Sequence, residues 1–192
     1  MEEDWKLGVR RREFLGLAGA TVLAGASGCG RSSGEWHFLT DVEARALGAL
    51  CNQIVPADEF PSAVESGVLV FLDRKLTTSL KEFQPIYRGG LATLDRSCVE
   101  AFGAPFEALP AERQNALVAL LETARPPFHR LRQPSAGEFW RAVNLHTLLG
   151  FYGDPRHGGN RGGVSWRMLG IPYECVRGRD HYEFQPPAGG RP

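Results

Sequence analysis

Residues 40–56 read Thr-Asp-Val-Glu-Ala-Arg-Ala-Leu-Gly-Ala-Leu-Cys-Asn-Gln-Ile-Val-Pro. Thr40 and Glu43 have the spacing of a capping box, in which each side chain accepts a hydrogen bond from the other residue's backbone N–H at the start of a helix. Apolar residues follow at helical spacing, and Pro56 ends the pattern because it has no N–H to donate. The stretch predicts a capped amphipathic helix.

Similar signals predict four more helices downstream. Ser62 and Glu65 repeat the capping pattern, and so do Ser135 and Glu138. Pro110 suits the first helical position of another helix, where its missing N–H has no helical partner. The apolar stripes expected to face the core are Val64, Val68, Leu72 and Leu76 in the second helix, which runs to about Leu80; Leu91, Leu94, Cys98 and Phe102 in the third, near 86–102; Leu117, Leu120 and Leu121 in the fourth; and Phe139, Val143, Leu149 and Phe151 in the fifth, before Gly150 and Gly153 break the pattern.

No stretch of the chain alternates apolar and polar residues with enrichment in β-branched types, so the sequence predicts an all-α fold, a single bundle of about five helices. From Asp154 onward glycine and proline are dense. Apolar anchors in this part predict an ordered irregular loop region rather than a linker: Trp166, Met168, Leu169, Ile171 and Tyr173. The expected domain spans 36–182, and 183–192 is expected to be a disordered tail.

The first 28 residues have the layout of a twin-arginine export signal. Arg11 and Arg12 precede Phe14 and Leu15, and an uncharged stretch rich in glycine and alanine follows. That stretch is far shorter than the roughly 20 apolar residues of a membrane-spanning helix. We therefore expect a removable signal and a mature protein outside the cytoplasm.

The end of the signal allows two kinds of processing. Ala26-Ser27-Gly28-Cys29 resembles a lipobox, in which the cysteine thiol receives a lipid, and the expected anchor at Cys29 would hold the protein on a membrane surface through a flexible tether at 29–35. Ala24-Gly25-Ala26 would also serve an ordinary signal peptidase that cuts after Ala26. The lipid-anchored form is the prediction, with periplasmic or extracytoplasmic localisation.

The twin-arginine route carries folded proteins, commonly those that have already bound a cofactor. The sequence holds no Gly-x-Gly-x-x-Gly after a strand pattern, no Cys-x-x-Cys-His and no cysteine cluster for iron and sulfur. We therefore expect no cofactor in this chain and infer that it accompanies a partner that holds one.

Charge and cysteine content narrow the function classes further. Lysine and arginine total 22, aspartate and glutamate total 22, and a neutral chain without a basic stripe is a poor candidate for binding nucleic acid. Beyond Cys29 the cysteines are Cys51, Cys98 and Cys175, with no metal-ligand spacing. A disulfide between Cys51 and Cys98 and two buried thiols remain alternatives.

Two regions of the sequence resemble a known family. They are Phe38-Leu39-Thr40 with Glu43, Ile54-Val55-Pro56-Ala57-Asp58, Ala63 and Gly67-Val68 near the start, and Gly150-Phe151-Tyr152-Gly153-Asp154-Pro155 with Gly158-Gly159-Asn160-Arg161 and Trp166 near the end. Over roughly 36–173 the chain resembles the gluconate 2-dehydrogenase subunit 3 family. The resemblance implies a small, exported, non-catalytic partner of an FAD-dependent sugar or polyol dehydrogenase of the glucose-methanol-choline type, with haem c in a third, cytochrome c subunit. The lipobox departs from the family's pattern.

The glycine-rich string near the end is the candidate partner interface. It comprises Asp154, Pro155, Gly158, Gly159, Asn160, Arg161 and Trp166. Trp166 is the expected aromatic anchor, and Asp154 and Asn160 are expected to bond backbone amides that hold the loop in shape. The alternative is a loop folded back over its own bundle, with Trp166 in the core. A phosphate cradle is disfavoured because no strand precedes the glycines.

Catalytic chemistry in this chain is the weakest of three function classes. His146, His157 and Asp154 match no familiar metal-ligand motif, and no Gly-x-Ser-x-Gly elbow is present. A solvated loop histidine and a hydrogen-bonded helix histidine explain His157 and His146. The favoured class is an accessory subunit of a flavoprotein dehydrogenase, and the other alternative is a free-standing lipoprotein that scaffolds an envelope component.

Overall fold

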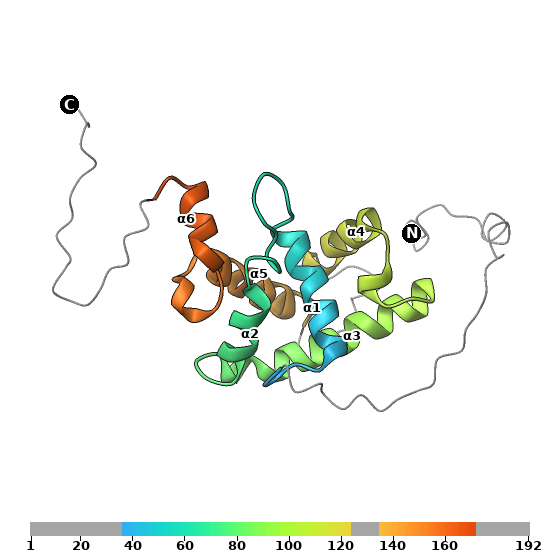
Figure 1. The fold of residues 1–192 in the computed structure, drawn as a ribbon. Coiled ribbons are helices and arrows are strands. Elements are labelled where there is room, and N and C mark those ends of the chain that lie inside the picture. The colour runs from blue at the N-terminus through green and yellow to red at the C-terminus, as the bar shows by residue number, and fades with distance from the viewer. Residues whose placement is uncertain (1–35, 124–134, 172–192) are drawn as a thin grey trace.

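The computed structural model describes residues 36–123 and 135–171, and over these ranges the chain forms helices and no strand (Figure 1). The α-helices are α1 (Asp41–Ile54), α2 (Val68–Leu76), α3 (Gln84–Phe102), α4 (Ala111–Glu122), α5 (Ala136–Tyr152) and α6 (Val164–Met168). Short 3-10 turns lie at Lys81–Phe83, Phe106–Ala108, Pro155–His157 and Arg161–Gly163. The predicted all-α class is confirmed. None of the described helices is long and apolar enough to cross a membrane.

Several predictions fall outside the described residues. They concern the export motif Arg11, Arg12, Phe14 and Leu15, the lipobox Cys29, the tether at 29–35, Tyr173, Cys175 and the tail at 183–192.

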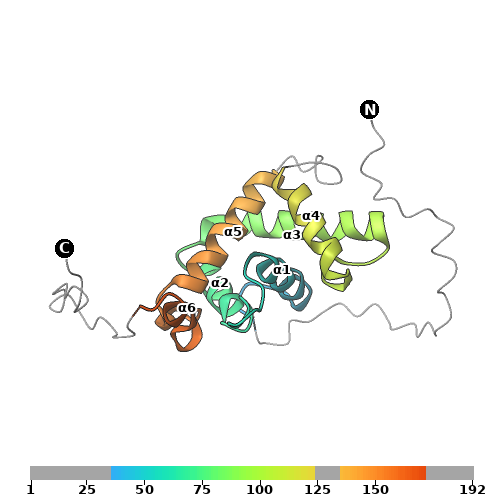
Figure 2. The same cartoon turned by 90° about the horizontal axis from the view of Figure 1, so that it is seen from above.

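Helix α5 is the centre of the bundle. It packs against α1, α2, α3, α4 and α6, and Figure 2 shows it crossing the molecule from α4 to α6. The largest side chains that are fully buried come from these helices and from the turn before α4: Leu47, Leu50, Leu72, Leu76, Tyr87, Leu94, Phe106, Leu117, Leu121, Phe139 and Phe151. Their removal from water is the main favourable contribution to folding.

Two of the predicted capping boxes begin helices as expected. The Thr40 amide donates to Glu43 Oε2 over 2.9 Å and the Glu43 amide donates to Thr40 Oγ1 over 3.3 Å, which starts α1. Ser135 and Glu138 repeat this exchange at the start of α5. Each box satisfies N–H groups that the first helical turn leaves without a helical partner.

The third capping pattern does not begin the helix predicted for it. Ser62 and Glu65 form the expected pair of bonds, at 2.8 and 3.4 Å, but these close only one turn. Gly67 follows with a φ of 86°, a left-handed conformation that interrupts the helix. Helix α2 therefore begins only at Val68. It ends at Leu76, short of the predicted Leu80.

The third predicted helix forms as α3, and it contains Gly89 and Gly90. Gly90 lies inside α3, and a Cβ atom built there would be 2.1 Å from Cδ2 of Phe139 on α5. The missing side chain therefore lets the Phe139 ring lie directly on the α3 backbone. Gly90 is a packing position rather than a helix breaker.

The fifth predicted helix extends further than expected and its stripe needs one correction. α5 continues through Gly150, where a Cβ atom would lie 2.8 Å from Cδ1 of Phe71. Phe139, Val143 and Phe151 face the core as predicted, but Leu149 is 49% exposed.

The C-terminal region contains more regular structure than predicted. The sixth helix, α6, and two 3-10 turns lie within the stretch expected to be irregular. Two of its expected apolar anchors, Leu169 and Ile171, are exposed, whereas Trp166 and Met168 are half-buried.

Two of the cysteines are buried and free. Cys51 Sγ lies 3.2 Å from Thr147 Oγ1, and no disulfide joins Cys51 to Cys98. Burial raises the pKa of both thiols to about 12. Of the two alternatives, the structure shows buried thiols.

Candidate functional site

The glycine-rich segment after α5, residues 153–163, is called the Gly-Gly-Asn loop below. Asp154 Oδ1 accepts a 2.9 Å hydrogen bond from the Arg156 amide and starts the 3-10 turn at Pro155–His157. Arg156 also donates to Asp154 Oδ2 from Nε and Nη2, at 2.9 and 2.6 Å. The bonds from the Arg156 side chain and amide lower the pKa of Asp154. The first part of the loop is thus fixed by a local carboxylate.

Asn160 holds the loop together from inside. Its side chain is fully buried, with Nδ2 donating to the Gly153 carbonyl over 2.8 Å and Oδ1 accepting from the Ser165 amide over 2.9 Å. The backbone of Asn160 is left-handed, with φ 45° and ψ 44°, a conformation that asparagine tolerates better than most residues. One amide side chain therefore connects the end of α5 to the start of α6.

The glycines let the loop lie against its own bundle. A Cβ atom at Gly159 would be 2.1 Å from the Gly150 carbonyl oxygen, and one at Gly67 would be 2.6 Å from the Gly158 oxygen. The Arg161 amide donates to the Ser66 carbonyl over 2.9 Å. The loop thus covers the end of α5 and the turn before α2.

The predicted interface residues differ in exposure. Gly159 and Asn160 are buried, Asp154, Pro155, Gly158 and Trp166 are half-buried, and Arg161 is exposed. Trp166, on α6, donates from its indole Nε1 to the Tyr152 carbonyl over 3.0 Å. Much of this string is therefore used for contacts within the chain, and its role toward a partner stays a prediction.

His146 and His157, the two histidines considered above for a metal site, have different surroundings. His146 is buried on α5, its Nδ1 lies 3.1 Å from the Tyr87 hydroxyl, and its ring is stacked on that of Tyr87 and edge-on to Phe83. Burial lowers the pKa of His146. His157 is exposed. Over 36–123 and 135–171 no group of three or more His, Cys, Asp or Glu side chains is placed to hold a metal ion.

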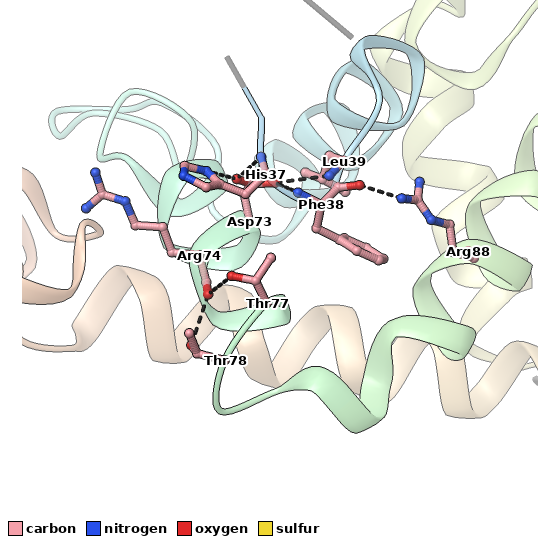
Figure 3. A network of polar contacts seen from close by, with 8 residues as sticks. All are labelled: His37, Phe38, Leu39, Asp73, Arg74, Thr77, Thr78 and Arg88. Atoms are coloured by element: carbon pink, nitrogen blue, oxygen red, sulfur yellow. Dashed lines mark hydrogen bonds and ion pairs between the residues drawn. The ribbon is translucent and has the colours of Figure 1, made fainter. Parts of the chain in front are cut away.

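The sequence prediction missed a buried carboxylate on α2. Asp73, on α2, is 2% exposed. It accepts hydrogen bonds from the amides of His37, Phe38 and Leu39 at 2.8, 2.8 and 3.0 Å (Figure 3). His37 Nδ1 lies 3.1 Å from the same carboxylate. Asp73 shares the inward face of α2 with Leu69, Leu72 and Leu76, and this position within the apolar stripe was a signal that the sequence contained.

Two opposing effects act on the Asp73 carboxyl group. Burial raises its pKa, but the bonds from Leu39, His37 and Phe38 outweigh burial and lower the pKa below its ordinary value. Nearby, the Arg88 guanidinium lies 4.1 Å from the Phe38 ring centroid and bonds both Glu43 and the Phe38 carbonyl. Together these contacts fix the segment from which the chain enters α1.

The outward face of α5 is apolar near its C-terminal end. Leu145, Leu148, Leu149 and Tyr152 are 56%, 37%, 49% and 41% exposed. With Gly153 they line a shallow hollow of about 320 Å³. A larger hollow of about 710 Å³ lies over α1, lined by Trp36, Asp41, Ala44, Arg45, Gly48, Ala49, Asn52, Val64, Leu69 and Glu107.

Comparison with known proteins gives one match. A family model described as gluconate 2-dehydrogenase subunit 3 matches residues 41–172. No curated protein and no solved structure matches the chain. The matched range covers α1 through α6, and it includes Asp73, the Gly-Gly-Asn loop and the outward face of α5.

Proposed function

Because this chain belongs to the gluconate 2-dehydrogenase subunit 3 family, we propose that it is the non-catalytic small subunit of an exported FAD-dependent dehydrogenase. The proposed complex oxidises a CH–OH group of a sugar, polyol or gluconate-type substrate. Its large subunit, a flavoprotein of the glucose-methanol-choline type, holds the FAD, and a cytochrome c subunit can pass electrons onward. The family match, which spans α1 through α6, carries this proposal.

The internal contacts of the chain support an accessory role. The buried groups that resemble catalytic residues are engaged in holding the fold. His146 lies against Tyr87, Asp73 accepts from three backbone amides, and Asn160 joins α5 to α6. Hydrogen-bonded polar groups of this kind give a bundle one defined arrangement. A rigid helical domain suits a subunit that supports the folding and export of a larger partner.

Export of the complex is proposed to depend on the paired arginines of this chain. Changing both Arg11 and Arg12 to Lys should retain this chain and its flavoprotein together in the cytoplasm, because the flavoprotein crosses as a passenger. Arg10→Lys is the matched control, since Arg10 precedes the motif. Fractionation followed by dehydrogenase assays gives the result. Full dehydrogenase activity outside the cytoplasm in the double variant would contradict the carrier role.

Membrane tethering is proposed to depend on lipid at Cys29. Cys29→Ala should release the mature subunit from the membrane fraction, because acyl chains contribute about 0.8 kcal/mol per buried methylene. Mass spectrometry of the mature N-terminus separates the two kinds of processing. An unmodified N-terminus at Ser27 would show that an ordinary signal peptidase acts instead.

The accessory role is tested directly by purifying the tagged full chain from its host. We expect FAD and dehydrogenase activity to co-elute with the complex, and neither to remain with the small subunit after the subunits are separated. FAD bound tightly to the separated small subunit would overturn the assignment. A chain that is exported and anchored but never brings a flavoprotein would instead be a free-standing lipoprotein that scaffolds another envelope component.

A further inference from the structure

Helix α5 is apolar on two faces. Its inward face packs in the core, and its outward face carries Leu145, Leu148, Leu149 and Tyr152, called here the outer stripe. These positions are spaced i, i+3, i+4 and i+7, so they lie side by side along one line of the helix. A helix at a protein surface normally places charged residues on its outward face, and a helix that is apolar all round is normally buried.

The outer stripe is held rigidly in place. α5 packs against five other helices, and the Trp166 indole bonds the Tyr152 carbonyl at the end of the stripe. Asn160 bonds the carbonyl of the next residue, Gly153. The Gly-Gly-Asn loop therefore acts as a support beneath the stripe. A rigid apolar surface binds a partner with little loss of conformational entropy.

We propose that the outer stripe, rather than the Gly-Gly-Asn loop, is the surface on which the large flavoprotein subunit docks. The proposal rests on the proposed function, and it assigns the docking residues on this chain. The partner surface that fits is an apolar projection that fills the hollow of about 320 Å³. Around this projection the partner carries carboxylates.

Charge near the stripe supports an acidic rim on the partner. In the described stretch 135–171, four arginines stand against two acidic residues: Arg141, Arg156, Arg161 and Arg167 against Glu138 and Asp154. All four arginines are exposed. Arg141 stands four residues before Leu145 on the same line of α5. The other three follow the C-terminal end of the stripe in the chain, and one of them, Arg156, is paired with Asp154. An apolar centre with a charged rim is the usual arrangement of a protein interface, and complementary charges speed association.

A second copy of this chain fits the stripe less well. The stripe consists of four partly exposed side chains on one helix. A stable interface uses roughly 20–30 residues on each side, so two copies that met through the stripe alone would have too small a contact. A two-fold dimer also brings the same surface against itself, so the arginine-rich rims would meet each other. A larger partner can extend beyond the stripe and can place carboxylates opposite the arginines of this chain.

The chain's own C-terminal segment is also a weaker candidate. The family match ends at residue 172, and all four stripe residues lie inside it. If residues 173–192 covered the stripe, the covering segment would lie outside the part of the chain that matches the family. A membrane is a third candidate, but the stripe spans only about 10 Å of helix and is hollow rather than convex. A protein projection fits such a surface better than lipid does.

The test uses a charge pair that leaves α5 stable. In the double variant Leu145→Glu with Leu149→Lys, the new residues stand four apart in the favourable order, and the lysine lies near the helix C-terminus. Val99→Glu is the control, since Val99 is 46% exposed on α3. The full chain is co-expressed with the flavoprotein that co-purifies with it from its host, and FAD per small subunit, dissociation constant and melting temperature are measured.

We expect the double variant to bind the flavoprotein at least tenfold more weakly, as loss of about 1.4 kcal/mol requires, while its melting temperature stays within about 2 °C of the parent. Val99→Glu should bind normally. The milder Leu149→Gln should weaken binding in the same direction, and it replaces the double variant if that variant melts early. Equal binding by parent and stripe variants would overturn the proposal and leave the proposed function intact.

The other occupants give different outcomes. If the parent chain brings no flavoprotein, the proposed function fails and the docking surface fails with it. Self-association of the parent that the double variant abolishes would assign the stripe to a second copy. Loss of stability on removal of residues 173–192 would assign it to the tail. Binding of the parent, but not the variant, to vesicles of anionic phospholipid without the flavoprotein would assign it to the membrane.

Discussion

Two segments of the chain are each held by a buried polar side chain, and the two side chains differ in chemistry. One is the entry segment before α1, residues 37–39, and the other is the Gly-Gly-Asn loop after α5. Asp73 collects three consecutive backbone N–H groups at 37–39. Asn160 donates to one backbone group and accepts from another. A carboxylate only accepts, so it suits an extended segment that presents several donors, whereas an amide can join a carbonyl to an N–H.

This difference gives the two buried side chains different responses to acid. The pKa of Asp73 is lowered in the folded protein, so its contribution to stability is present above about pH 4 and is lost as the pH falls through the folded-state pKa. The amide of Asn160 does not titrate. The bonds of Asp73 should therefore be lost in acid while those of Asn160 persist. At the start of the same loop, Asp154 also has a lowered pKa, so its bonds to Arg156 weaken as the pH falls.

The largest effect is expected from Asp73→Ala. It should lower the free energy of unfolding at pH 7 by about 3–5 kcal/mol, because three backbone donors lose a charged acceptor. Asp73→Asn should cost roughly half as much, since one amide oxygen can still accept two of the bonds. Urea unfolding at pH 7 gives both values. Glu100→Ala, an exposed change on α3, is the control.

The same variants test the pH response. The stability difference between parent and Asp73→Asn should shrink between pH 7 and pH 3, because the parent loses its carboxylate contribution there. A difference that stays constant would show that Asp73 does not supply the acid sensitivity of the entry segment.

Asn160→Ala comes next, with an expected loss of about 2–3 kcal/mol from two buried bonds and a left-handed backbone. Asn160→Asp should respond to pH in the opposite direction to Asp73. Its carboxylate would face the Gly153 carbonyl, which raises the folded-state pKa, so this variant should regain stability as the pH falls. Thermal melts at pH 7 and pH 4 measure this. The stability difference between parent and Asn160→Asp should shrink from pH 7 to pH 4, and a difference that grows in acid would contradict the bonding described here.

His146 titrates in a separate window and must be distinguished from Asp73. Burial lowers the pKa of His146, so its contribution is present above about pH 6.5 and is lost as the pH falls below that value. The parent should lose stability between pH 7.5 and pH 5.5 because the folded state binds the His146 proton less readily than the unfolded state does. His146→Gln can still bond the Tyr87 hydroxyl, and it should remove this drop in denaturant unfolding.

The smallest effect is expected from Trp166→Phe. An aromatic ring is kept, although it is smaller than the indole, and the bond from the indole to the Tyr152 carbonyl is lost, which should cost about 1 kcal/mol. Leu169→Ala is a control on the segment after α6, since Leu169 is 56% exposed. A loss for Trp166→Phe as large as that for Asn160→Ala would show that α6, rather than Asn160, holds the loop.

Local chemistry explains which parts of this fold the sequence could predict. The boxes at Thr40–Glu43 and Ser135–Glu138 start helices because their bonds reach only three residues. The pair at Ser62–Glu65 makes the same bonds, yet the chain turns at Gly67. A capping pattern therefore predicts a helical turn, and only the residues that follow decide whether a helix continues.

Long-range contacts explain what the sequence could not predict. The partners of Asp73 lie 34–36 residues away, so nothing near it identifies them. Leu149 was expected to face the core because periodicity finds apolar stripes without telling which of two stripes faces inward. Within the loop, where Asp154 and Asn160 were expected to bond backbone amides, both partners lie within five residues.

The contact between Gly90 and Phe139 couples substitutions at these two positions, which lie on different helices. A Cβ atom at Gly90 has no room while the Phe139 ring is present, and a smaller residue at 139 leaves an empty space while Gly90 is unchanged. Each single change is therefore disfavoured, whereas the pair Gly90→Ala with Phe139→Leu compensates in volume. A change of this pair in two steps passes through a single-substitution variant that is less stable. The two positions are therefore expected to change together or not at all.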